Sequence, residues 1–230
     1  MTVSEGTHAA CPLCCSGAEP FIVLKGRAYY RCGTCEARFL HPAHYPGAEA
    51  EHAYYRLHEN DADDPRYRRF LSRLADPLIA RLAPGSSGLD YGCGPGPALA
   101  AMLREAGHRV ALFDPFFVPD RSVLSARYDF VTCSEVAEHF HRPAQEFARL
   151  RGLVRPGGWL AVMTCFQTDD ARFARWHYVS DPTHVVFYRE TTLRHLADSW
   201  GWTCTVPAKD VALLQRPRQV AGAQVFDPTS

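Results

Sequence analysis

The chain has 230 residues, of which 47% are apolar, which is enough for one sizeable core, alone or with a small appended module. Its 25 basic and 25 acidic residues balance, so a broad basic surface for wrapping a polynucleotide is not expected. No apolar run approaches the roughly 18 residues that span a bilayer, and the polar start at 2–8 shows no signal-peptide pattern. We expect a cytoplasmic protein with no membrane partner.

Four of the nine cysteines form two CxxC pairs near the N-terminus. A tetrahedral zinc ion binds four thiolates, and each pair supplies two of them from one turn. The runs between the pairs predict a hairpin that turns near Lys25 and Gly26 and brings the pairs together. A small module with few apolar residues needs such a crosslink. The sequence therefore predicts, within residues 1–41, a zinc ribbon whose structural Zn²⁺ is held by Cys11, Cys14, Cys32 and Cys35.

The other five cysteines are scattered, mostly in apolar stretches, and are expected to act as small buried residues. One of them, Cys15, adjoins Cys14 and is an alternative ligand, although Cys14 has the better spacing from Cys11. Residues 1–10 are expected to be a loose tail, and the proline-rich stretch 41–47 a linker.

Residues 48–82 carry an apolar pattern with helical spacing. Asp63 and Asp64 before Pro65 predict a helix start, because acids favour the positive end of a helix and proline suits its first turn. We therefore assign residues 42–83 to a linker and helical cap.

Strand-like and helical stretches then alternate over residues 84–218, and 219–230 form a tail. Such alternation predicts an α/β fold with a mostly parallel sheet covered on both faces. Two consecutive strand-like stretches at the end, "TCTVPA" and "VALLQ", predict an antiparallel edge. The expected strands before them are "GLDYG", "RVALFD", "YDFVTCS" and "WLAVMTC", and the expected helices are "PALAAMLREAG", "AQEFARLRGLV" (stopped by "RPGG") and "TTLRHLADSW".

The stretch "LDYGCGPG" at 89–96 follows the first strand, where open α/β sheets bind ligands. Its glycines allow a sharp turn and a close approach by the ligand. The pattern D-x-G-x-G-x-G is not the dinucleotide loop, which would need glycine at Pro97. Asp90 suits an ammonium group, and Asp114, at the end of the next strand, suits two ribose hydroxyls. A nucleoside joined to an amino acid satisfies both.

At this point the chain resembles the class I S-adenosylmethionine-dependent methyltransferases over residues 65–216. The stretches that carry the resemblance are "LDYGCGPG", "VALFDP", "YDFVTCSEVAEHF" and "LVRPGGWLAVMT". The resemblance implies a Rossmann-like sheet of seven strands and S-adenosylmethionine as cofactor. One departure is that the third strand, with its adenine-contacting acid, is compressed into "DRSVLSA" at 120–126. The cofactor residues that the resemblance implies are Asp90, Gly92, Cys93, Gly94 and Gly96 at the methionine part, Asp114 at the ribose, Pro115 and Phe116 near the adenine, and Glu135 at the substrate entrance.

Two histidines are the candidate catalytic residues, because methyl transfer to oxygen or to an acidic carbon also needs a base. His139 follows the fourth strand, at a position that in related methyltransferases lies at the mouth of the active site. His184 lies in 167–188, a connection long enough to be a lid at the ligand edge of the sheet. Its alternative role is to fix this loop with Asp181. A metal site of His139, His177 and His184 is a further alternative.

The function favoured by these features is methyl transfer from S-adenosylmethionine to an oxygen, carbon or nitrogen of a small molecule. A balanced charge and a lid rich in aromatic residues and histidines favour a compact substrate over RNA. One alternative is an RNA base methyltransferase that grips RNA with the zinc ribbon. The other is a non-catalytic protein that binds the cofactor and serves as an interaction partner. In the methyltransferase reading, Tyr54, Tyr55 or His58 is placed to cover the cofactor, or else to pack in the core.

Overall fold

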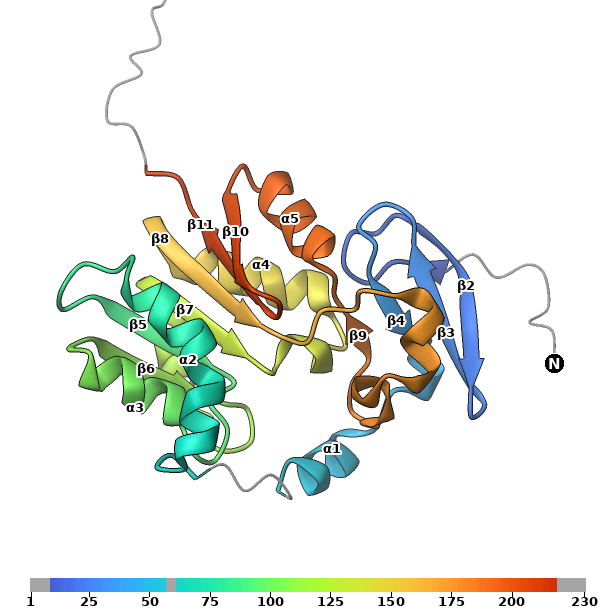
Figure 1. Cartoon of the computed structure of the whole chain (residues 1–230), viewed down its shortest axis with the longest axis horizontal. Helices are drawn as coiled ribbons and strands as arrows, with labels where there is room; N and C mark the ends of the chain where they lie inside the picture. The colour runs from blue at the N-terminus through green and yellow to red at the C-terminus, as the bar shows by residue number, and fades with distance from the viewer. Residues whose placement is uncertain (1–8, 57–60, 219–230) are drawn as a thin grey trace, which may run out of the picture.

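The computed structural model describes residues 9–56 and 61–218, which form two sheets that lie side by side (Figure 1). A six-stranded sheet carries helices on both faces, and a five-stranded sheet lies beside it. One apolar core runs through both sheets, because buried residues of the ribbon such as Tyr29 and Phe39 join the same cluster as Leu89 and Val131. In the described ranges no helix has both the length and the apolar character to cross a membrane. The N-terminal tail expected at 1–10 is corrected at its end, because Ala9–Ala10 form strand β1; residues 1–8 and the expected tail at 219–230 lie outside the described residues.

The six-stranded sheet has the order β10-β11-β8-β7-β5-β6. Neighbours among β5, β6, β7 and β8 pair in parallel, and β11 pairs antiparallel with both β8 and β10. The predicted antiparallel edge is therefore confirmed. The strands are β5 (Ser87–Tyr91), β6 (Arg109–Phe113), β7 (Tyr128–Ser134), β8 (Val154–Met163), β10 (Thr203–Ala208) and β11 (Val211–Gln215).

The sheet has six strands where seven were expected. Beyond β6, where a third parallel strand would pair, the described chain instead forms the short 3-10 helix η2 (Arg121–Ser125). The Asp120 carboxylate caps this turn by accepting a hydrogen bond of 2.9 Å from the backbone N–H of Ser122. A further parallel strand would need a crossover connection of about a dozen residues or more after β6, and the compressed stretch 120–126 is too short to provide it.

Two helices cover each face of this sheet. Helix α2 (Pro65–Ile79) packs on α3 (Ala98–Glu105) on one face, and α4 (Pro143–Leu153) and α5 (Glu190–Ser199) cover the other. As predicted, Asp64 caps α2 by accepting from Arg66 N at 2.8 Å, with Pro65 in the first turn. The helical pattern at 48–82 is divided between α2 and a separate α1 (Ala48–Tyr55). Helix α4 ends at Leu153, just before "RPGG", as predicted. The four residues of "RPGG" themselves form part of strand β8, which begins at Val154.

The ribbon contributes four strands to the five-stranded sheet, β1-β2-β3-β4-β9. Its hairpin turns at Lys25 and Gly26, both with positive φ, as a tight turn between antiparallel strands requires. The fifth strand, β9, comes from the predicted lid and pairs antiparallel with β4. The strands are β1 (Ala9–Ala10), β2 (Gly17–Leu24), β3 (Arg27–Cys32), β4 (Arg38–Leu40) and β9 (Val186–Phe187).

The lid, residues 167–188, is packed into the fold and does not stand away from it. Its 3-10 helices η4 (Asp170–Arg175) and η5 (His177–Ser180) lie between the ribbon and the large sheet (Figure 1). Phe173 is fully buried, with its ring 5.2 Å from Phe21 and 5.4 Å from Tyr29 of the ribbon. The ribbon and the lid therefore form one wall beside the large sheet.

Candidate active site

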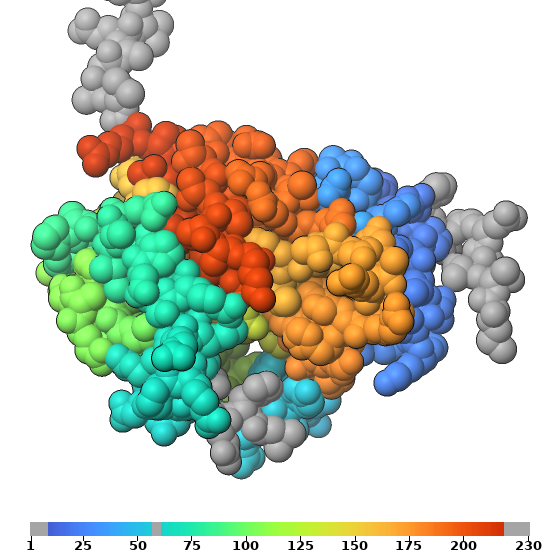
Figure 2. Space-filling model, in the orientation of Figure 1, coloured from blue at the N-terminus to red at the C-terminus, as the bar shows by residue number. Residues whose placement is uncertain are grey.

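A cleft of about 1060 Å³ opens at the carboxyl ends of the parallel strands. The space-filling view shows the molecule hollowed between α2 and the lid, with α1 below (Figure 2). Ligand sites usually measure about 300–1,000 Å³, so there is room for a nucleoside cofactor and a second small molecule. The walls come from the loops after β5, β6 and β7, together with α1, α2 and the lid.

The loop after β5 is shaped by two glycines that have positive φ, +79° at Gly92 and +64° at Gly94. A Cβ at Gly92 would lie 2.4 Å from Val136, so this position excludes any other residue. The backbone N–H groups of Gly92 and Cys93 donate to Phe113 O at 2.7 and 3.2 Å, which joins this loop to the end of β6. Gly92, Cys93 and Gly94 all line the cleft.

Asp114 follows β6 and lines the same part of the cleft. Its Oδ2 accepts a hydrogen bond from Gly94 N at 3.0 Å, and its Oδ1 accepts from Phe116 N at 2.8 Å and Phe117 N at 3.1 Å. These bonds fix the carboxylate between the two loops. An ionised carboxylate has about four acceptor positions, so one remains for a ligand hydroxyl. Pro115 and Phe116 line the cleft beside it.

Two predicted cofactor residues, Asp90 and Gly96, do not line the cleft. The Asp90 side chain is buried under the loop, where its Oδ1 accepts a hydrogen bond of 2.7 Å from the Thr132 hydroxyl of β7. Burial raises the pKa of Asp90 to about 6. Asp90 therefore supports the loop from below, and the sequence pattern gave no sign of Thr132 as its partner.

Glu135 lines the cleft and has a backbone φ of +52°, which is rare for a residue other than glycine. Its N–H donates to Met163 O at 2.8 Å, and its Oε2 accepts a bond of 3.4 Å from the Tyr178 hydroxyl of the lid. Burial, and then the charge of Glu138, raise the pKa of Glu135 to about 9. The protonated form of this carboxyl, which can donate a hydrogen bond, is therefore favoured.

The structure brings His139 and His184 together, with ring centroids 4.7 Å apart, on the lid side of the cleft. His139 Nδ1 lies 3.2 Å from Thr183 O, and His184 Nδ1 lies 2.7 Å from Tyr178 O. Because a carbonyl oxygen only accepts, each Nδ1 carries a proton, and Nε2 is the ring nitrogen that can act as a base or a ligand. Burial lowers the pKa of His184, which favours the neutral form of that ring.

The sequence analysis missed Glu138, whose side chain is fully buried beside the two histidines. The Tyr178 hydroxyl donates to Glu138 Oε1, and Thr164 Oγ1 lies 3.1 Å from the same hydroxyl. One signal was present, because "EHF" at 138–140 places a carboxylate next to a candidate histidine. The predicted metal alternative included His177, but its side chain is exposed and lies outside the group formed by Glu138, His139 and His184.

Helix α1 covers the other end of the cleft with aromatic side chains. His52 stacks on Phe116 with centroids 5.0 Å apart and an angle of 9° between the rings, and Tyr55 meets His139 edge-on at 5.1 Å. Tyr54 and Tyr55 both line the cleft, while His58 lies outside the described residues. Each of these contacts joins α1 to a candidate cofactor or catalytic residue.

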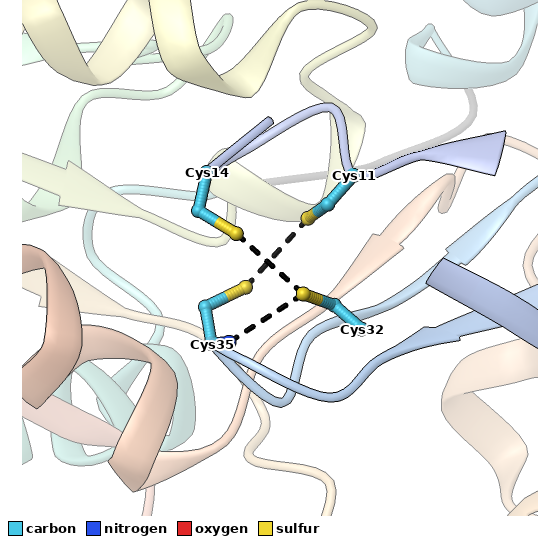
Figure 3. Close-up of side chains that lie close together, drawn as sticks. All are labelled: Cys11, Cys14, Cys32 and Cys35. Carbon is cyan, nitrogen blue, oxygen red and sulfur yellow. Dashed lines mark hydrogen bonds between the residues drawn. The ribbon is translucent and has the colours of Figure 1, made fainter. Parts of the chain in front are cut away.

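The four predicted zinc ligands come together from the turn between β1 and β2 and the turn between β3 and β4 (Figure 3). Cys11 Sγ lies 3.6 Å from Cys35 Sγ, and Cys14 Sγ lies 3.5 Å from Cys32 Sγ. Four sulfurs at about 2.3 Å from one zinc ion would stand about 3.8 Å apart, so the cluster has nearly the required size. Cys15 is exposed and is not one of the cluster.

Comparisons with known proteins agree with this geometry. A family model described as a methyltransferase domain matches residues 63–205, and the chain belongs to this family, as a class I S-adenosylmethionine-dependent methyltransferase. A search of curated protein sequences finds no match.

Several solved structures are similar to this chain at low sequence identity. The chain is similar to the 1,6-didemethyltoxoflavin-N1-methyltransferase of Burkholderia thailandensis, solved with its substrate and S-adenosylhomocysteine, at 19% identity over 87% of this chain and 100% of that one, with a TM-score of 0.50. Human N-acetylserotonin methyltransferase with S-adenosylmethionine matches at 16% identity over 75% and 60%, with a TM-score of 0.49. An O-methyltransferase family protein of B. thailandensis matches at 19% over 69%, with a TM-score of 0.47, and the chain spans 62% of its length.

Proposed function

We propose that this protein transfers a methyl group from S-adenosylmethionine to an oxygen, carbon or nitrogen atom of a small molecule. The main support for this proposal is that one cleft has a cofactor side and an acceptor side, each with its own set of candidate residues. The glycine loop and Asp114 line one side, and His139 and His184 line the other. Glu135 lines the cleft too, and Tyr178 of the lid joins it to the histidine side.

On the cofactor side, S-adenosylmethionine supplies an electrophilic methyl group on its sulfonium. The remaining acceptor capacity of Asp114 suits a ribose hydroxyl, and the bare backbone at Gly92 and Gly94 lets the methionine part approach closely. Pro115 and Phe116 offer an apolar surface for the adenine. Asp90 and Gly96 act here indirectly, by shaping the loop.

On the acceptor side, the two histidines present Nε2 atoms as bases or ligands. A base beside an acceptor hydroxyl removes the proton that would otherwise stay on the acceptor oxygen and leave it positively charged after methylation. Asp181 and Thr183 hold the turn that carries His184, because Asp181 Oδ1 accepts from Thr183 N and Oγ1 at 2.8 and 2.5 Å. Asp181 therefore fixes the loop, as the alternative hypothesis expected, and in doing so it also positions His184 in the site.

A small molecule fits this cleft better than RNA does. The cleft is bounded by α1, α2 and a packed lid, and the toxoflavin methyltransferase that shares this fold acts on a small molecule. Three of the ribbon's cationic side chains are already engaged: Arg31 pairs with Glu19, Arg38 pairs with Asp170, and Arg27 donates to Pro182 O. They leave little free positive charge for gripping a phosphate backbone.

We also propose that Cys11, Cys14, Cys32 and Cys35 hold a structural Zn²⁺. The sulfur spacings support this, and the N–H groups of Thr34 and Cys35 point at Cys32 Sγ at 3.4 and 3.5 Å, as a zinc-bound thiolate favours. In this view the chain divides into a ribbon (1–41), a linker and helical cap (42–83), a catalytic domain (84–218) with the lid at 167–188, and a tail (219–230).

The test is a product screen with purified protein, S-adenosylmethionine and a panel of small molecules bearing phenol, enol, sugar hydroxyl and amine groups. We expect S-adenosylhomocysteine to form together with one acceptor that gains a methyl group by mass spectrometry. Asp114→Ala and His184→Ala should each lower the yield of this product strongly. Methylation of RNA alone would support the RNA alternative, and cofactor binding with no methylated product from any acceptor class would support the non-catalytic one.

A further inference from the structure

The buried group of Glu138, His139 and His184 has the composition of a catalytic metal site. We propose that these three side chains bind a divalent transition-metal ion such as Zn²⁺, and that this ion holds the acceptor through a hydroxyl oxygen. The inference rests on the proposed function and narrows it to O-methylation. It concerns a second ion, separate from the one in the cysteine cluster.

The donor atoms already lie close to one another. One ligand atom from each of the three side chains falls within 4.8 Å of the other two, and His139 Nε2 is 4.0 Å from Glu138 Oε1. Ligands at about 2.1 Å from one ion in tetrahedral geometry stand roughly 3.4 Å apart. Small side-chain rotations therefore close the site without any change in the backbone.

The groups around the three residues orient them as the outer groups of a metal site do. Each imidazole donates its Nδ1–H to a backbone carbonyl, from Thr183 or Tyr178, which leaves Nε2 as the ligand atom. The Tyr178 hydroxyl holds Glu138 Oε1 in the same way. Both orienting carbonyls and the tyrosine come from the lid, so the closed lid builds the site.

Glu138 supplies a second and independent indication. Its side chain is 0% exposed, yet Oε2 has no hydrogen-bond partner among the residues that the structure describes. An unpaired carboxylate oxygen in the interior is strongly unfavourable unless a cation or a hydrogen-bond donor meets it. Since a ligand atom of Glu138 also lies within 4.8 Å of both histidines, one metal cation could balance this carboxylate and bind both imidazole rings.

The site is open on one side, because all three residues line the cleft. Two histidines and one carboxylate leave further coordination positions free, which distinguishes a catalytic site from a closed Cys₄ site. A hydroxyl bound there has a lowered pKa and loses its proton to solvent. The oxygen then forms a bond to the methyl carbon, the carbon–sulfur bond breaks, and its electron pair stays on sulfur, giving S-adenosylhomocysteine.

The test is a metal count by mass spectrometry on protein stripped with a chelator, reloaded with excess Zn²⁺ and freed of unbound metal. The proposal predicts two ions per chain for the wild type and one for Glu138→Gln and for His184→Asn. The control His177→Asn changes an exposed histidine of the same lid and should keep two. Circular dichroism and binding of S-adenosylhomocysteine show whether each variant is folded.

Cobalt substitution gives a second readout that does not depend on activity. The first equivalent of Co²⁺ should produce the intense thiolate charge-transfer absorption of the ribbon site. The second should add a visible band without thiolate character, and Glu138→Gln should remove only this band. A wild type that binds one ion, with no second band, would show that the proposal is wrong. If that protein still binds S-adenosylhomocysteine and methylates an acceptor, the proposed function stands without the ion; if it does neither, the function itself fails.

Discussion

The Arg38 guanidinium of the ribbon and the Asp170 carboxylate of the lid are joined by two hydrogen bonds, from Nε to Oδ1 at 3.0 Å and from Nη2 to Oδ2 at 2.8 Å. The Arg38 side chain is 3% exposed, so this pair is buried on the arginine side. Two residues of β4 also pair with β9, which begins two positions after His184. The ribbon thus supports the segment of the lid that carries His184. Strand β4 connects the cysteine cluster of the ribbon to this candidate catalytic histidine.

Loss of the Asp170 carboxylate should destabilise the ribbon and the lid together. Removing one partner of a buried ion pair leaves the other charge uncompensated, which typically costs about 3–5 kcal/mol. We expect Asp170→Ala to lower the free energy of unfolding by an amount near the low end of this range, because Asp170 is 31% exposed. Chemical denaturation measures the change. The exposed Asp198 on α5 provides the control, and equal effects of Asp170→Ala and Asp198→Ala would contradict the account.

Replacing Asp90 with asparagine should stabilise the protein in a way that depends on pH. The folded pKa of Asp90 is about 6 against an ordinary 3.8, so the unfolded chain loses this proton first and stability falls as pH rises between the two values. The full penalty, present above the folded pKa, is on the order of 3 kcal/mol. Asp90→Asn keeps an acceptor for Thr132 and removes the charge.

The gain from Asp90→Asn is therefore expected to be about 3 kcal/mol near pH 7.5 and to shrink to roughly 1 kcal/mol near pH 4.5. Urea unfolding at both pH values measures the free energy of unfolding of the variant and of the wild type. The contributions of the other titrating groups cancel when the two values at one pH are subtracted. A gain that is the same at both pH values would mean that Asp90 is ionised in the folded protein throughout.

Loss of one cysteine ligand should remove the ribbon's metal and much of its stability. Loss of a structural metal belongs to the changes that cost about 4 kcal/mol or more, which corresponds to a fall of roughly 8–16 °C in the melting temperature of a chain of this size. We expect this for Cys32→Ser, together with one zinc ion fewer per chain. Cys15→Ser, outside the cluster, should leave both quantities unchanged. A normal zinc count in Cys32→Ser would rule out the predicted ligand set.

His184 should matter for turnover and not for cofactor binding. With the acceptor found in the product screen, we expect His184→Ala to lower kcat by about 10²–10⁴-fold, because a group that activates the acceptor oxygen, as base or as metal ligand, is lost. The affinity for S-adenosylhomocysteine should change less than about twofold, because His184 lies on the acceptor side of the cleft. The control His44→Ala, which changes an exposed histidine that does not line the cleft, should keep most of the activity. If His184→Ala also lost affinity for S-adenosylhomocysteine, His184 would belong to the cofactor side of the cleft, and its assignment to the acceptor side would be wrong.

The order of elements in the catalytic domain follows from the sequence because it depends on local patterns. The strand ending at Tyr91, the glycines after it and the helix cap at Asp64 were all predictable from neighbouring residues. The partners of buried polar groups were not. Asp90 meets Thr132 across 42 positions and Glu138 meets Tyr178 across 40, and nothing local marks either pair.

The pairing of β9 with the ribbon was also hidden from the sequence. Val186 and Phe187 form a strand of two residues, too short for an alternating pattern, and their partner β4 is remote in the chain. The sequence indicated a lid and a ribbon separately, and only the three-dimensional contact shows that they form one wall. Strand β6 lies at the edge of the six-stranded sheet because the shortened stretch at 120–126 forms η2 and no further strand pairs beyond β6 among the described residues.

The most direct test of the account is a calorimetric titration of S-adenosylhomocysteine into the wild type, Asp114→Ala and Asp120→Ala. The account predicts one binding site per chain in the wild type and a loss of roughly 10- to 150-fold in affinity for Asp114→Ala, as expected when hydrogen bonds to a charged group worth about 1.5–3 kcal/mol are removed. Asp120→Ala, whose carboxylate caps only η2, should bind like the wild type. Equal affinity in all three proteins, or no binding in the wild type, would contradict the assignment of the cleft.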